Sequence, residues 1–165
     1  MKKYELTNET KIISGKKLYR IKALISFGTV SKGDLGGFIE KEDNLSQTGN
    51  AWVYSNAWVY GDARVYDNAQ VCGDARVCGD ARVYGDADYI TVKGLGSCNR
   101  VTTVCKDKNL GVSVKCGCFF GDLKEFENKI KETHGDNKFA KEYNALITLI
   151  KIHFEISKET DNEQA

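Results

Sequence analysis

The sequence has almost no net charge, no long hydrophobic run and no apolar leader. Its 165 residues carry a formal net charge of +1, so we expect no basic surface of the kind that binds nucleic acid. The longest apolar stretches are far too short to cross a bilayer, and the lysine-rich start lacks the apolar core of a signal peptide. We therefore expect a cytoplasmic protein of one compact domain or two small ones, with neither nucleic acid nor a membrane as partner.

Disulfides and metal sites also have little support. Six cysteines among many lysines and glutamates are typical of reduced thiols rather than of a disulfide framework. Cys116 and Cys118 would share one face of a strand, but zinc requires four converging ligands and there is no second closely spaced pair. Possible further ligands are Cys98, Cys105 and His134. We expect buried reduced thiols, no metal and no cofactor.

Residues 50–87 repeat a six-residue unit six times and begin a seventh: NAWVYS NAWVYG DARVYD NAQVCG DARVCG DARVYG DA. Asn or Asp opens each unit, Ala follows, and Val comes two residues later. A short regular period of this kind is typical of a solenoid, in which each unit is stable only when stacked on its neighbours. Because Ala and Val are two apart, both point to the same side of an extended segment. The period does not fit 3.6 residues per turn, which excludes a helix.

The repeat resembles the hexapeptide-repeat family of left-handed parallel β-helices, in which an aliphatic residue is followed four places later by a small one, as in Val53 and Ala57. The resemblance implies three hexads per triangular coil, so that residues 18 apart stack and six hexads form two coils. The pairs expected to stack are Val53 and Val71, Trp58 and Arg76, Arg64 and Arg82, and Asn50 and Asn68. The fold class expected is mainly β, a short left-handed parallel β-helix.

The segment before the hexads predicts a cap. Residues 4–27 alternate in the manner of a β-hairpin, with Ser14 and Gly15 at its turn. A solenoid leaves an open end, and an atypical neighbouring segment is expected to cover it. We therefore expect residues 1–49 to form an N-terminal β cap.

The segment after the hexads predicts an α+β module. Residues 88–120 alternate as an antiparallel meander. Two helices follow. Asp122 is expected to cap the first, with Glu125 completing a capping box, and Asp136 or Asn137 is expected to cap the second. The domain organisation expected is a cap over 1–49, the solenoid over 50–87, an α+β module over 88–156 and a disordered tail over 157–165.

The flanking motifs narrow the resemblance. LYRIKAL, LGGFIEKEDNLS, CGCFFGDLKEF and THGDNKFAKEY, together with the hexads, resemble a group of proteins of tailed phages and prophages over roughly residues 4–155. The resemblance implies a phage or prophage context and assigns no catalytic residue. Our leading interpretation is a non-enzymatic binding protein in the host cytoplasm, which holds a small ligand or blocks a host defence protein. The alternative is a structural β-helix protein of the virion.

An enzyme is the third interpretation. Many hexapeptide-repeat proteins are acyltransferases, which use a histidine on or near the coils as general base. Residues 50–87 contain no histidine, and the two in the chain are His134 and His153. A zinc carbonic anhydrase of the same fold needs three His ligands, more than the chain has. We expect His134 at a helix C-terminus, His153 partly buried, and no catalytic residue.

The residues expected to face outward from the coils have the composition of a protein interface. Aromatic residues and arginine occur there without lysine, and two exposed tryptophans on so small a solenoid favour burial against a partner. Trp58 beneath Arg76 would form a cation–π pair. Because the family commonly forms trimers, we expect a homotrimer through Trp52, Trp58, Tyr60, Arg64, Arg76 and Arg82.

A polar run within residues 88–120 is the candidate ligand surface. Arg100, with neighbouring hydroxyl and backbone donors, has the chemistry to bind a small anion. The candidate residues are Ser97, Asn99, Arg100, Thr102 and Thr103, with His134 nearby if the fold brings it there. The alternative is an ordinary polar strand and turn.

Overall fold

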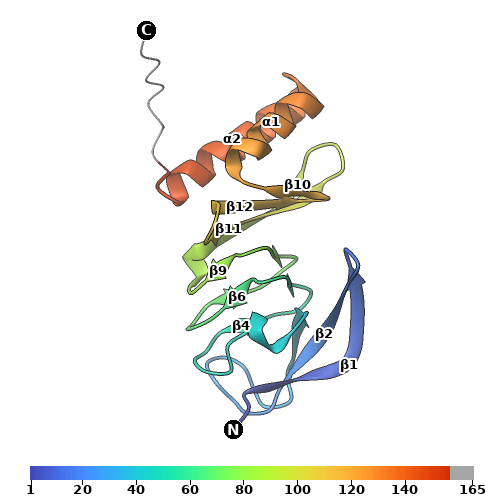
Figure 1. Cartoon of the computed structure of the whole chain (residues 1–165), viewed down its shortest axis with the longest axis vertical. Coiled ribbons are helices and arrows are strands. Elements are labelled where there is room, and N and C mark those ends of the chain that lie inside the picture. Colours follow the sequence, from blue (N-terminus) through green and yellow to red (C-terminus); the bar gives the residue numbers. More distant parts are fainter. Residues whose placement is uncertain (157–165) are drawn as a thin grey trace.

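The computed structural model describes residues 1–156, so the disordered tail predicted for residues 157–165 lies outside the described range. Along the long axis of the molecule come first the cap, meaning here the part of residues 1–49 outside the N-terminal hairpin, and then two stacked coils, an antiparallel sheet and a pair of helices (Figure 1). A hairpin lies beside the coils. The cap and the sheet thus cover the two open ends of the solenoid.

The hexads form the stacked coils predicted from the period of six. Their strands are β4 (Trp52–Val53), β5 (Trp58–Val59), β6 (Arg64–Val65), β7 (Gln70–Val71), β8 (Arg76–Val77) and β9 (Arg82–Val83). Each pairs in parallel with the strand one coil away, in the order β4–β7, β5–β8 and β6–β9. This confirms the predicted stacking of Val53 on Val71, Trp58 on Arg76 and Arg64 on Arg82. Asn50 Nδ2 also donates to Asn68 Oδ1, at 3.1 Å.

The inside of the coils is a dry column of alanine and valine. Every hexad Ala and Val from Ala51 to Val83 is 0% exposed. The residue that closes a unit makes the turn, and Ser55, Gly61, Asp67, Gly73 and Gly79 all have φ between 49° and 72°. Gly85 has an extended φ of −147° instead, because the chain leaves the coil there for a short 3₁₀ helix, Asp86–Asp88.

The N-terminal hairpin is confirmed and is continuous with one face of the coils. β1 (Tyr4–Ile13) and β2 (Lys16–Ala23) pair antiparallel. β3 (Leu35–Ile39) pairs antiparallel with β2 and parallel with β5. The backbone of β3 passes very close to the coils, because a Cβ on Gly36 would lie 2.5 Å from the Val53 carbonyl oxygen. Glycine is therefore required at this position.

The outward exposure predicted for Trp52 and Tyr60 is wrong. Trp52 is 1% exposed, and its ring lies 6.2 Å from that of Tyr4 and 5.4 Å from that of Phe27. Tyr60 is buried against Leu18 of the hairpin. The physical reason is that the N-terminal segment folds over β4 and β5. Trp52 joins the core of the coils together with Tyr4, and Tyr60 packs in a separate cluster with Leu18 and Phe38. Trp58, Arg76 and Arg82 stay half-buried, and Arg64 is exposed.

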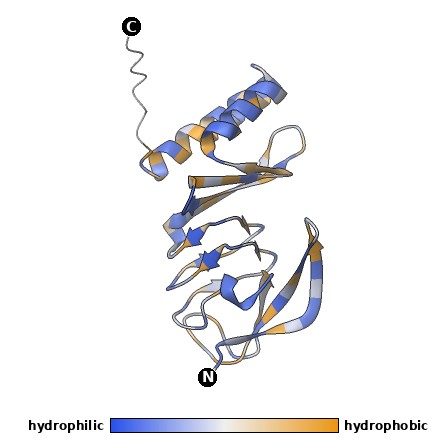
Figure 2. Ribbon diagram, viewed as in Figure 1, coloured by the Kyte–Doolittle hydropathy of each residue, from blue (hydrophilic) through white to orange (hydrophobic). Residues whose placement is uncertain are grey.

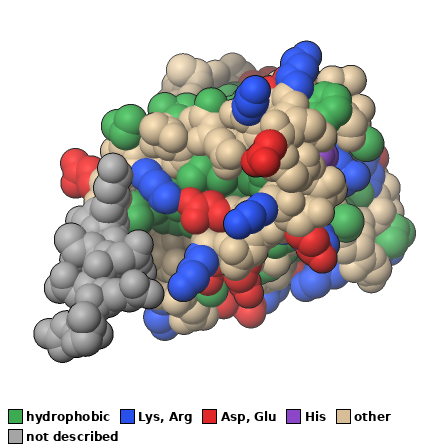
Figure 3. All heavy atoms as spheres, turned by 90° about the horizontal axis from the view of Figure 1, so that it is seen from above, with side chains coloured by type: hydrophobic (Ala, Val, Ile, Leu, Met, Phe, Trp, Pro, Cys, Tyr) green, Lys and Arg blue, Asp and Glu red, His purple; other side chains and the backbone are tan. Residues whose placement is uncertain are grey.

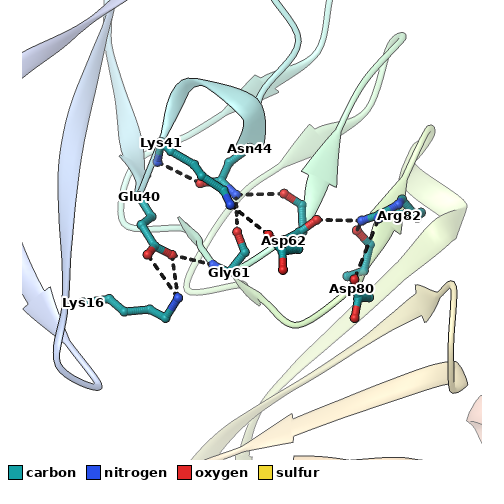
Figure 4. A network of polar contacts seen from close by, with 10 residues as sticks. Lys16, Glu40, Lys41, Asn44, Gly61, Asp62, Asp80 and Arg82 are labelled. Carbon is teal, nitrogen blue, oxygen red and sulfur yellow. Dashed lines mark hydrogen bonds and ion pairs between the residues drawn. The ribbon is translucent and has the colours of Figure 1, made fainter.

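A polar network joins the cap to the corner of the coils (Figure 4). Glu40 accepts hydrogen bonds from the Gly61 N–H at 2.6 Å and from Lys16 Nζ at 3.0 Å. Burial alone would raise the pKa of Glu40, but the Gly61 hydrogen bond and the Lys16 ammonium outweigh it and lower the pKa. Asn44 Nδ2 donates to the carbonyl oxygens of Gly61 and Ala63. These bonds satisfy turn groups of the first coil that would otherwise lack partners.

Residues 88–121 form the predicted antiparallel meander, with one strand more than we predicted. The strands are β10 (Tyr89–Leu95), β11 (Arg100–Asp107), β12 (Gly111–Cys116) and β13 (Phe119–Gly121), in that order across the sheet. β11 lies between two cores, because Cys105 packs on the coils while Val104 packs on the helices. Both faces of this strand are therefore covered.

Two helices of the described chain cover the far face of the sheet: α1 (Leu123–His134) and α2 (Lys138–His153). The capping box predicted at Asp122 and Glu125 is present, and Asn137 rather than Asp136 caps α2. Apolar and polar residues alternate along these elements (Figure 2). Among residues 1–156, no helix is both long enough and apolar enough to cross a bilayer.

The position predicted for His134 is confirmed, whereas the burial predicted for His153 is not. His134 lies in the last turn of α1, as expected, and is half-buried. The partial burial predicted for His153 is wrong, because Ile150 is the last buried residue of α2 and His153 is exposed. Its Nε2 lies 2.8 Å from the Ala87 carbonyl oxygen.

Candidate functional site

A cavity of about 200 Å³ opens between the β10–β11 turn, the β12–β13 turn and the helices. Three of the predicted ligand residues line it: Ser97 from the first turn, Arg100 from the start of β11 and His134 from the end of α1. The fold thus brings His134 to the same cavity as Arg100, although 34 positions separate them in the sequence. The cavity is the place where the sequence-predicted ligand residues converge.

Arg100 lies against the tight turn between β12 and β13. Gly117 at this turn has φ 57°, and a Cβ on it would collide with the Arg100 guanidinium. Arg100 also contacts the thiol of Cys98. Hydrogen bonds from Ser97 and then from Arg100 lower the pKa of Cys98, and the same contact raises the pKa of Arg100. The exposed guanidinium thus has neighbours on both the β10–β11 and the β12–β13 turns.

Aromatic side chains form much of the cavity wall. The imidazole of His134 stacks on the Tyr143 ring, with centroids 5.7 Å apart and planes at 23°. Phe126 contacts the edge of Tyr143 at 5.7 Å and lies 5.3 Å from Phe119. Burial raises the pKa of Tyr143, and its hydroxyl donates to the Leu95 carbonyl oxygen at 3.4 Å. The wall therefore suits an apolar or aromatic group.

Three predicted ligand residues do not line this cavity. Thr102 is fully buried and donates to Cys116 Sγ at 3.2 Å. Thr103 is also buried, and its Oγ1 accepts the Arg76 N–H at 3.0 Å. Asn99 is exposed in the turn with φ 47°. The sequence suggested an exposed polar strand, but β11 is covered on both faces, so the threonines join structural elements instead.

The helices supply cavity residues that the sequence analysis did not identify. They include Phe126, Lys129 and Thr133 of α1 and Tyr143 of α2. Their spacing is that of a helix face packed on a core. No signal in the sequence distinguishes a helix residue that lines a cavity from one that fills the core beside it.

The cysteines do not converge with other ligands. Among residues 1–156, no group of three or more His, Cys, Asp or Glu side chains is close enough to hold a metal ion. Cys105 lies on the solenoid side of β11, where burial raises its pKa, whereas Cys116 lies on the helix side. Cys98 and Cys118 are exposed. β11 therefore separates two of the possible ligands.

The upper end of the molecule, seen over the helices, shows positive and negative side chains interspersed, with apolar side chains between them (Figure 3). This face therefore lacks a field of one sign. The general charge of this face would therefore attract neither anions nor cations, and the positive charge at the cavity is that of individual residues such as Arg100.

The hexads match a known repeat. The family model described as the YdcK beta solenoid repeat matches residues 57–73 and 75–87. The cavity and its helices lie outside the match. A comparison with curated proteins finds no match. The stacked coils and the repeat match together show that the chain is a β-solenoid repeat protein.

Proposed function

We propose that the protein is a non-enzymatic binding protein of a phage or prophage, which captures a small anionic ligand in the cavity beside Arg100. The observation that carries this proposal is the convergence of Ser97 and Arg100, from the β10–β11 turn and the start of β11, with His134, from the end of α1, on one partly aromatic cavity. Cavities of this composition, with a few placed polar groups, are the usual form of a small-molecule site.

The cavity limits the ligand class. Its volume of about 200 Å³ is below the range of about 300–1,000 Å³ common for larger ligands. Arg100 and Lys129 supply positive charge, whereas Phe119, Phe126 and Tyr143 supply apolar contact. A small aromatic carboxylate fits both, with its ring on the aromatic wall and its carboxylate on the guanidinium.

Replacement of Arg100 tests this function. Loss of a charge-assisted hydrogen bond costs about 1.5–3 kcal/mol, so Arg100→Ala is expected to weaken binding of benzoate about 10- to 100-fold. Calorimetry on the full chain measures the affinity. Benzamide, a neutral isostere, should bind weakly to both proteins. Native mass spectrometry of the protein purified from cells would show a ligand that remains bound.

The control is Lys124→Ala, which removes an exposed charge from α1 outside the cavity. It should leave benzoate affinity unchanged. Equal affinity of Arg100→Ala and the unmodified protein would rule out the anion site. Failure of both proteins to bind benzoate, with no extra mass in the native spectrum, would instead favour a host protein as the target.

We further propose that the coils are left-handed and that the protein assembles as a homotrimer in the host cytoplasm. The hexad pattern supports the handedness. The face of β6 and β9 supports assembly, because Arg64 is exposed and Tyr84, stacked 4.6 Å from Tyr66, is 52% exposed. Sedimentation at micromolar concentration should give three times the monomer mass, and Arg64→Glu should reduce it. A monomer at that concentration would remove the trimer proposal.

A further inference from the structure

A second groove lies where the hairpin, the coils and the C-terminal sheet meet. Its volume is about 380 Å³. Lys11 of β1, Arg76 of β8 and Lys93 of β10 line it, together with Asp74 and Trp58. Three cationic side chains thus reach one groove from three different parts of the fold. None of these residues lines the cavity beside Arg100.

The groove has an excess of positive charge. Asp74 is its one acidic lining residue, and it pairs with Lys93 at 2.7 Å. Lys11 and Arg76 form no ion pair within residues 1–156. The groove therefore has three cations against one carboxylate, whose charge also acts on Arg76, in a protein whose overall charge is close to zero.

Two of these cations, Arg76 and Lys11, are held in place without a ligand. The Arg76 guanidinium lies 4.6 Å from the centre of the Trp58 ring, which confirms the predicted cation–π pair. The backbone N–H of Arg76 donates to Thr103 Oγ1, which fixes the strand against β11. Lys11 Nζ lies 4.4 Å from the centre of the Phe38 ring. Because these side chains are already ordered in the folded protein, a ligand that binds them would lose less side-chain entropy.

We propose that this groove is a second binding site, which takes a compact anion with at least two negative charges, of the pyrophosphate type. A guanidinium stacked on an aromatic ring still presents N–H groups that bind phosphate oxygens in bidentate fashion. Lys11 supplies a second positive charge from the hairpin, and a phosphate near Lys93 would compete with Asp74 for its ammonium. A single negative charge would engage one of these cations and leave the others uncompensated.

Titration of the full chain with inorganic pyrophosphate tests the proposal. Calorimetry at constant ionic strength is expected to show one saturable site, with orthophosphate binding at least 10-fold more weakly. Occupancy should change the fluorescence of Trp58, and Trp58→Phe should lose this response because Trp52 is buried away from the groove. Arg76→Gln is expected to weaken pyrophosphate binding at least 10-fold, and Lys11→Gln several-fold.

Lys17→Gln is the control. Lys17 is an exposed lysine of the same hairpin as Lys11, its Nζ lies 5.3 Å from the centre of the Tyr19 ring, and it does not line the groove. Equal weakening by Lys17→Gln and Arg76→Gln, in variants with unchanged unfolding midpoints, would show general charge attraction and overturn the proposal. So would the absence of a saturable site, or equal affinity for orthophosphate. Loss of pyrophosphate binding in Arg100→Ala would show that pyrophosphate binds in the cavity beside Arg100 instead. That result would also overturn the proposal.

Discussion

Trp52→Ala is expected to lower the free energy of unfolding by about 3–5 kcal/mol, the usual cost of removing a large buried aromatic side chain. Trp52 is 1% exposed and contacts the rings of Tyr4 and Phe27. Its loss would leave a cavity between β4 and the N-terminal segment, which covers one end of the coils. Urea unfolding followed by circular dichroism measures the change, and the midpoint should fall markedly.

Trp58→Ala is the matched control for Trp52→Ala. Trp58 occupies the same position in the next hexad but is half-buried under Arg76. Its replacement is expected to cost about 1–2 kcal/mol, within the ordinary range for a single substitution. Similar losses for the two variants would contradict the burial of Trp52 between the N-terminal segment and β4.

Lys3→Met is expected to lower the free energy of unfolding by about 2–3 kcal/mol, because it leaves buried carbonyl groups without donors. Lys3 is 2% exposed. Its Nζ donates to the Ala51 carbonyl oxygen at 2.8 Å and to that of Thr48 at 3.3 Å, and lies 4.8 Å from the centre of the Phe27 ring. The ammonium thus donates hydrogen bonds to the backbone carbonyl groups where the coils begin. Chemical unfolding is again the measurement.

Lys2→Met is the control for this variant. Lys2 pairs with Glu42 at 2.7 Å, but both side chains are about half exposed. An exposed pair contributes about 0–1 kcal/mol, so Lys2→Met should leave stability nearly unchanged. A loss as large as that of Lys3→Met would mean that the general charge of the N-terminus, rather than the buried donor, stabilises the cap.

The difference in stability between the unmodified protein and Lys3→Met should also depend on pH. Burial lowers the pKa of Lys3 to about 8, whereas an unfolded lysine titrates near about 10.4. Between these values the unfolded chain binds more protons than the folded one, so the Lys3 contribution to stability rises with pH. Between pH 8 and 9.5 the difference should grow by about 1.5 kcal/mol. A constant difference would place the pKa of Lys3 near its ordinary value.

The candidate site shows where sequence analysis succeeded and where it failed. Arg100 was identified because its charge stands among hydroxyl groups, and it lies at a cavity. Thr102 and Thr103 have the same local character but are buried. The difference arises because β11 lies between the coils and the helices, and alternation within one strand does not reveal what covers each face. Phe126 and Tyr143 resembled core residues for a similar reason.

The sequence by itself determined the repeat architecture. The six-residue period defines which residues stack, because each unit pairs with the unit 18 residues away and the Ala and Val of all units share one core. Local capping chemistry likewise determined where α1 begins, because the side chain of Asp122 caps the helix. These features depend on neighbours in the chain or on a strict period, both of which the sequence displays directly.

Only the tertiary structure decided which outward side chains meet solvent. Trp52 and Trp58 occupy the same place in their hexads, yet the first is buried beneath Tyr4 and Phe27 and the second lines an open groove with Arg76. The repeat gives both residues the same local environment, and the flanking segments make them different. Contacts between segments far apart in the sequence have no period, and for this reason the two candidate sites became visible only in the folded protein.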